Sequence, residues 1–162
     1  MVNKHKFPIE GGCSCGTVRF KLLTLPLFVH CCHCSWCQRE TGASFALNAL
    51  IESEEVKLTK GETETIHTPS NSGKGQNIVR CITCKTAIWS NYAAAGDSIN
   101  FMRVGAFDNP DLCPPDIHIF TSTKQNWISL RGNVSVVEEY YQRSKHWPQS
   151  SIDRYFKATG KT

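Results

Sequence analysis

Long apolar runs are missing from this 162-residue chain, and their absence excludes several classes of protein. No stretch approaches the roughly 20 apolar residues of a membrane-spanning helix, and no apolar secretory segment stands at the start. The formal net charge is only +4 and the basic residues are scattered, so we expect neither nucleic-acid nor membrane binding. Internal repeats are also missing. We therefore expect residues 1–162 to form one domain, which is long enough to bury a core without disulfides.

Cysteine is abundant, with nine residues. Their odd number and clustered spacing argue against a disulfide scaffold and for a reducing compartment, the cytoplasm. In the densest cluster, Cys32, Cys34 and Cys37 place three sulfurs on one short turn, where they can converge on a thiophilic ion, most simply zinc. Because zinc is nearly always four-coordinate, such a site takes its fourth ligand from elsewhere or leaves that position open for water or substrate.

Two further pairs of cysteines stand on tight turns. If they combine, they make a complete four-cysteine set, which is typical of a closed structural zinc site; its members would be Cys13, Cys15, Cys81 and Cys84. The triad then has no spare thiol except Cys31 and Cys113. Three cysteine clusters in one chain favour metal binding, and the count gives one closed four-cysteine set and one open triad.

At these residues a family resemblance appears. The order Gly-Cys-x-Cys-Gly-x-Val-Arg-Phe at 12–20, Cys-His-Cys-Ser-x-Cys-Gln-Arg-x-Thr-Gly-Ala at 32–43 and Arg-Cys-x-x-Cys at 80–84 resembles the glutathione-dependent formaldehyde-activating enzyme family. Segments near 104–108, 115–120 and 124–127 are similar to later parts of that family, so the resemblance covers about residues 11–130. It implies a zinc-bearing β-tent fold, shared with accessory proteins of Rab nucleotide exchange. It also implies a structural zinc on the first and last pairs and a catalytic zinc on the triad.

The resemblance further implies the reaction. A carbon–sulfur lyase of this family joins or splits glutathione and formaldehyde, so the expected partners are a small thiol and a small aldehyde. From the residues alone, three thiolates on Zn²⁺ leave room for an exogenous thiol or oxygen, and the ion raises the reactive thiolate fraction or polarises a carbonyl. The alternative is a non-catalytic zinc module that binds a protein partner, as the Rab-accessory relatives suggest.

Two departures from the family pattern concern the metal motifs: Lys85 replaces a glycine, and Cys31 adds a thiol beside the triad. Three polar residues are candidates for substrate binding, although each could equally serve in packing: Gln38, Arg39 and His118. Several neighbours receive a structural interpretation: the His33 ring points away from the triad metal, Trp89 and Trp127 belong to the core, Cys113 is a buried loop thiol, and Cys31 is free or replaces a ligand.

Secondary structure is predicted to be mainly β, in short antiparallel sheets around the zinc knuckles. Short segments that are rich in β-branched or aromatic residues and bounded by turn residues predict strands at 17–22, 27–30, 44–51, 56–59, 64–68, 76–80, 87–92, 99–104 and 117–120. Residues 1–10 are expected to be loose, 35–40 to form a helical turn, 70–75 a hairpin loop, and 134–141 stays ambiguous. Apolar residues at helical spacing predict a short helix at 150–158 that packs on the sheet.

Overall fold

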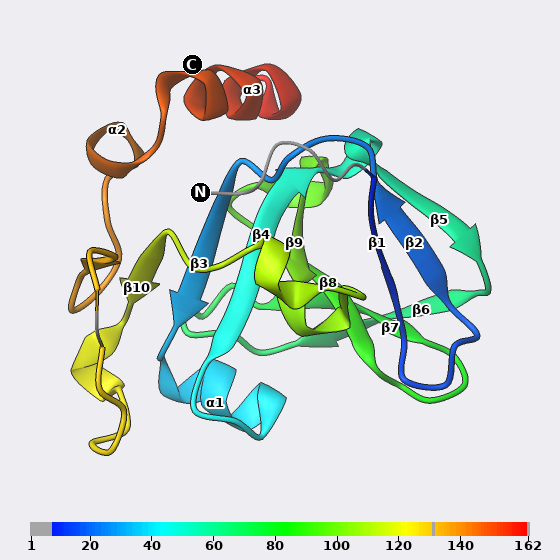
Figure 1. The fold of residues 1–162 in the computed structure, drawn as a ribbon, viewed down its shortest axis with the longest axis horizontal. Coiled ribbons are helices and arrows are strands. Elements are labelled where there is room, and N and C mark those ends of the chain that lie inside the picture. The colour runs from blue at the N-terminus through cyan, green and yellow to red at the C-terminus, as the bar shows by residue number, and fades with distance from the viewer. Residues whose placement is uncertain (1–7, 131, 162) are drawn as a thin grey trace.

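The computed structural model describes residues 8–130 and 132–161, which form a mainly β protein with short helices (Figure 1). The strands are β1 (Ile9–Gly12), β2 (Arg19–Leu22), β3 (Phe28–Cys32), β4 (Ala46–Glu52), β5 (Val56–Lys60), β6 (Thr63–Thr68), β7 (Gln76–Cys81), β8 (Ala87–Tyr92), β9 (Ile99–Arg103), β10 (Ile117–Ile119) and β11 (Ser135–Val136). The helices are α1 (Ser35–Thr41), α2 (Arg143–His146) and α3 (Gln149–Thr159). The predicted mainly β architecture with a short C-terminal helix is confirmed. None of the helices in the described ranges has the length and apolarity to cross a bilayer.

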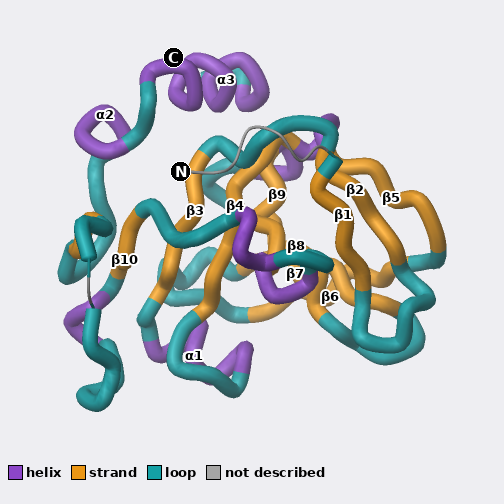
Figure 2. Tube along the Cα trace, viewed as in Figure 1, coloured by secondary structure: helices purple, strands orange, loops and turns teal. Residues whose placement is uncertain are grey.

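Two sheets organise the strands, as the tube drawing shows (Figure 2). A three-stranded sheet has the order β1-β2-β5, and an eight-stranded sheet has the order β11-β10-β3-β4-β9-β8-β7-β6. Neighbours pair antiparallel, as expected, except that β10 runs parallel to both β3 and β11. Because β10 follows β3 only after a long excursion of the chain, no turn signal in the sequence sets this direction.

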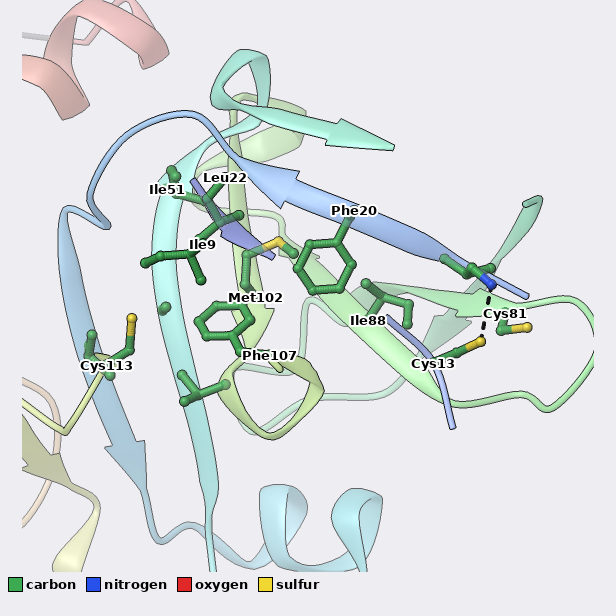
Figure 3. Packing of buried hydrophobic residues seen from close by; sticks show 14 residues of the cluster. Ile9, Cys13, Phe20, Leu22, Ile51, Cys81, Ile88, Met102, Phe107 and Cys113 are labelled. Carbon is green, nitrogen blue, oxygen red and sulfur yellow. Dashed lines mark hydrogen bonds between the residues drawn. The ribbon is translucent and has the colours of Figure 1, made fainter. Parts of the chain in front are cut away.

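The first core fills the space between the two sheets. Figure 3 shows Phe20 and Leu22 of β2 pointing toward Ile51 of β4 and Met102 of β9, all of them buried. Phe20 also meets Phe107 edge to face, with ring centroids 6.0 Å apart. Hydrophobic side chains from both sheets therefore hold them together, the main driving force for such packing.

The start of the described chain corrects one prediction. Residues 1–10 were expected to be loose, but Ile9 opens β1, is only 2 % exposed and pairs with Leu22 of β2. The backbone passes so close to the next segment that a Cβ on Gly11 would lie 2.4 Å from the Ala106 carbonyl oxygen. Burial of Ile9 and this close approach at glycine outweigh the polar composition around them. Residues 1–7 lie outside the described residues.

A second core lies on the other face of the large sheet, beneath α3. Trp147 and Tyr155 are buried there and their rings meet at 90°. An ion pair fixes the helix: Arg154 donates to both carboxylate oxygens of buried Glu52 at 2.7 Å and to the Leu25 carbonyl at 3.0 Å. The prediction that the C-terminal helix packs on the sheet is confirmed.

We expect Arg154→Ala to lower the free energy of unfolding by about 2 kcal/mol. The reason is that Glu52 stays buried after its partner is lost, while the partial exposure of Arg154 reduces the effect. Chemical denaturation measures this change. Lys157→Ala on the same helix, which loses an exposed charge, is the matched control with little expected effect. Equal losses in the two variants would contradict a role for the ion pair.

Other expectations have mixed outcomes. The ambiguous stretch 134–141 contains only β11, and α2 was not predicted. Residues 70–75 form a turn, and Cys113 is fully buried, both as predicted. Trp89 packs against the first core, but Trp127 is 75 % exposed, so its assignment to the core was wrong. The Trp127 indole nitrogen donates to the Gln125 side chain at 2.7 Å on a loop, where no strand turns it inward.

Candidate metal centres

Four cysteines from two distant turns converge beside the first core. Cys13 and Cys15 follow β1. Cys81 is the last residue of β7, and Cys84 lies in the turn after it. The four sulfurs all lie within 4.8 Å of one another. The Cys13–Cys15 sulfur separation is 3.5 Å and the Cys15–Cys81 separation is 3.9 Å. Tetrahedral zinc with Zn–S bonds of about 2.3 Å requires sulfur separations of about 3.8 Å. The donor set and its spacing therefore fit a closed zinc site.

Hydrogen-bond donors surround these sulfurs and favour the thiolate form. The backbone NH groups of Val18 and Thr83 donate to Cys13 and Cys81 at 3.2 and 3.4 Å. The hydrogen bond with the Thr86 side chain, at 3.1 Å, is the main cause that lowers the pKa of the Cys84 thiol to about 5. Since metal ligands must be deprotonated, these contacts prepare the sulfurs for an ion.

Lys85, which stands where the family has glycine, has a left-handed backbone with φ of 62°. Its amide donates to the Cys81 carbonyl at 3.0 Å, which closes the turn that carries Cys81 and Cys84. A side chain in this conformation costs roughly 1 kcal/mol relative to glycine. The Lys85–Glu64 ion pair, at 2.7 Å, is largely exposed and offsets little of that cost.

We therefore expect Lys85→Gly to be more stable than Lys85→Ala by about 1 kcal/mol, because both variants lose the ion pair and only one keeps a Cβ at positive φ. Denaturant unfolding at saturating zinc gives the two free energies. Equal stability of the two variants would show that the turn relaxes to a different conformation.

The triad forms where β3 passes into α1. Cys32 ends β3, Cys34 is the N-cap of α1, and Cys37 lies in the first turn of the helix. All three are buried, and their sulfurs lie within 4.8 Å of one another. In the described part of the chain, no fourth Cys, His, Asp or Glu side chain joins them within that distance. The arrangement fits three ligands of a zinc ion with one position left for another group.

Local contacts stabilise a negative charge at the triad. The Cys37 amide donates to the Cys34 sulfur at 3.3 Å, as an N-cap requires. Hydrogen bonds from the side chains of Cys32 and Cys37 are the largest causes that lower the pKa of the Cys34 thiol, and burial opposes them. Gly42, in the left-handed conformation, ends α1 and gives its amide to the Gln38 carbonyl.

A buried arginine faces the triad from the neighbouring strands. Arg103 of β9 is 9 % exposed and donates to the side chains of Asn48, at 2.6 Å, and Ser90, at 3.1 Å. Among residues 8–130 and 132–161, no carboxylate forms an ion pair with Arg103. Its charge acts on Cys37 and on partly buried Tyr92. Arg103 was not identified from the sequence. The one signal for it was a charged residue in a predicted strand, at a position where the alternation of side chains places it toward the core.

Aromatic side chains cover the same face of the sheet. Tyr141 contacts the His30 ring and accepts a hydrogen bond from the Trp147 indole at 2.6 Å. His30 is 2 % exposed, and burial, aided by the charge of Arg143, lowers its pKa to about 3. His30 is therefore neutral at pH 7 and serves as part of this wall. The three triad cysteines are buried in the same cluster as Phe28 and Trp147, and burial strengthens electrostatic interactions.

The structure divides the three candidate substrate residues. Gln38 and Arg39 of α1 line a surface cavity of about 410 Å³ together with Ser35, Gly42, Ala43, Ser44 and Gln125. The Gln38 amide donates to the carbonyls of His33, at 2.8 Å, and Thr123, at 2.9 Å. Gln38 therefore ties α1 to the turn after β10, whereas Arg39 is free to meet a ligand in the cavity. His118 does not line this cavity.

His118 lies instead beside Cys31 and His33, which alternate along the chain with the triad residues Cys32 and Cys34. Its Nδ1 is 3.0 Å from Nε2 of His33, which is 3.5 Å from the Cys31 sulfur. As the sequence predicted, the His33 ring points away from the triad. The grouping of Cys31, His33 and His118 was not predicted, because it depends on the parallel pairing of β10 with β3.

The chain is similar to several known proteins. The model of a family described as glutathione-dependent formaldehyde-activating enzyme matches residues 8–123. A protein of Halomonas elongata that carries the provisional name glutathione-dependent formaldehyde-activating enzyme is 24 % identical over 129 residues, or 76 % of this chain and 82 % of that protein. A crystal structure of a Rhodobacter sphaeroides protein covers 66 % of this chain and 97 % of its own, at 20 % identity and a TM-score of 0.49.

Proposed function

This chain belongs to the glutathione-dependent formaldehyde-activating enzyme family, and from that premise we propose that it is a zinc-dependent carbon–sulfur lyase. It joins or splits a glutathione-like thiol and a small aldehyde such as formaldehyde. In the joining direction the thiol sulfur bonds to the carbonyl carbon, the C=O double bond becomes a single bond, and the thiol proton passes to the oxygen. The name of the Halomonas elongata relative supports the same substrates.

The observation that carries the proposal is the three-sulfur triad with no fourth protein ligand among the described residues. Cys32, Cys34 and Cys37 would hold zinc there, and a bound zinc supplies a Lewis acid that lowers the pKa of a thiol or polarises a carbonyl. Cys13, Cys15, Cys81 and Cys84 would hold the structural ion. The grouping of eight of the nine cysteines in candidate metal clusters supports a reducing compartment such as the cytoplasm.

Neighbouring side chains have separate roles in the proposal. The Arg103 guanidinium, held by Asn48 and Ser90, offsets the negative charge of three thiolates and stabilises charge that develops on the substrate oxygen or sulfur. Arg39, which lines the cavity beside α1, binds a carboxylate of the thiol substrate. Gln38 positions α1 against the turn that carries Thr123. The placement of His118 gives it no part in this cavity.

The test is exchange between free and adduct forms of the aldehyde, followed by magnetic resonance in mixtures of formaldehyde and glutathione. The uncatalysed reaction also proceeds, so the rate must rise in proportion to added protein. We expect the protein to increase the exchange rate less for thiols that lack a carboxylate. No increase for any thiol or small aldehyde would reject the enzyme and favour a zinc module that binds a protein partner.

A further inference from the structure

A third group of ligating atoms converges outside the two zinc sites. The atoms are the Cys31 sulfur, His33 Nε2 and His118 Nδ1, all within 4.8 Å of one another. The sulfur and His33 Nε2 are 3.5 Å apart, and the two nitrogens are 3.0 Å apart. With Zn–S near 2.3 Å and Zn–N near 2.0 Å, a tetrahedral ion needs separations of about 3.5 and 3.3 Å. The three atoms are thus spaced almost as ligands of one ion.

Hydrogen bonds alone do not satisfy this group. A ring nitrogen of histidine offers one proton or one lone pair in its plane, so His33 Nε2 can pair with the Cys31 sulfur or with His118 Nδ1, not with both. An ion at the centre would accept a lone pair from all three atoms. The chemistry of the group, one soft sulfur and two imidazoles, is that preferred by late first-row transition metals.

The fold keeps this group apart from the triad. Side chains alternate between the faces of a strand, so Cys31 of β3 points away from the face that carries Cys32. The parallel pairing places His118 of β10 beside Cys31. Cys31 and His33 are 2 % and 0 % exposed, while His118 is only partly buried and leaves an approach from solvent.

We propose that Cys31, His33 and His118 form a third metal site, which binds an ion of the Zn²⁺ class and leaves one position for water or another ligand. One thiolate and two neutral imidazoles leave a divalent ion with a net charge of +1. Ligating histidines normally donate their second ring NH to a partner, but His33 Nδ1 is buried and has none among the described residues. The site is therefore weaker than the four-cysteine site and exchanges its ion first.

The experiment counts metal ions on the full-length protein, loaded with zinc and equilibrated with chelators of increasing strength. We expect three equivalents on the wild type, with one removed by a weak chelator. His118→Asn and Cys31→Ser should each hold two, and His118→Asn combined with Cys34→Ser only one. Cys113→Ser removes a thiol that belongs to no cluster, so this matched control should keep three. Circular dichroism checks that each variant is folded.

Cobalt provides a second readout that does not depend on activity. Filling of the third site by Co²⁺ should add a thiolate charge-transfer band that Cys31→Ser abolishes and Cys113→Ser retains. His118 is partly exposed, so His118→Asn decides the question if Cys31→Ser does not fold. A wild type that holds only two equivalents would overturn the proposal, and so would a third equivalent that persists in His118→Asn. Neither result bears on the lyase reaction, which is assigned to the triad.

Discussion

Cys84→Ser is expected to unfold the protein or lower its melting temperature severely, with loss of one zinc equivalent. The four-cysteine set joins segments whose members Cys15 and Cys81 are 66 residues apart, so the ion closes a long loop between the two sheets. Zinc binding to such a site contributes of order 10 kcal/mol to folding. Whole domains are stable by only about 5–15 kcal/mol, so the loss is comparable to the total stability.

The choice of Cys84 separates metal loss from packing loss. Cys84 is only partly buried, so serine leaves no cavity at that position. Cys113 is fully buried, so any packing cost should be larger there, yet Cys113→Ser is expected to lose only about 1–2 kcal/mol. Thermal melting with and without chelator, together with zinc analysis, compares the two variants. A soluble Cys84→Ser protein with unchanged melting and full metal would remove the structural site.

Cys34→Ser is expected to abolish the proposed lyase activity while the fold and the proposed structural zinc are kept. Serine is a favoured N-cap, so its hydroxyl can still accept the Cys37 amide and α1 should persist. The triad lies on one local turn and connects no distant segments, so folding does not depend on it. A serine oxygen replaces one thiolate, the second ion binds weakly, and its loss removes several kcal/mol of transition-state stabilisation, about a thousandfold in rate.

The measurement compares the catalysed exchange of glutathione and formaldehyde for the wild type, Cys34→Ser and the control Cys113→Ser at equal protein concentration. Circular dichroism and zinc content establish that the structural site is intact in each. Wild-type activity in Cys34→Ser would place the reaction elsewhere. If the wild type itself accelerates exchange no more than Cys34→Ser does, the module that binds a protein partner becomes the better account.

The convergence of the triad was predictable because its three cysteines are local in sequence. Cys32, Cys34 and Cys37 lie on one turn whose geometry is set by the N-cap and by Gly42, so their convergence needs no knowledge of the fold. Periodicity likewise predicted most strands and α3, since alternation and helical spacing record which side chains face a core. The sequence showed that Lys85 departs from the family pattern, but it did not show that this residue has a left-handed backbone.

Tertiary structure alone decided the contacts between segments that are distant in sequence. The pairing of β10 with β3 brings His118 to Cys31, and the register of β9 with β4 brings Arg103 to Asn48. Ile9 is a core residue because β1 pairs with β2. Strand direction and register over such separations follow from the packing of the whole chain rather than from local propensity. The sequence by itself therefore identified two candidate sets of metal ligands, and the fold decided that the members of the four-cysteine set meet and what surrounds both sets.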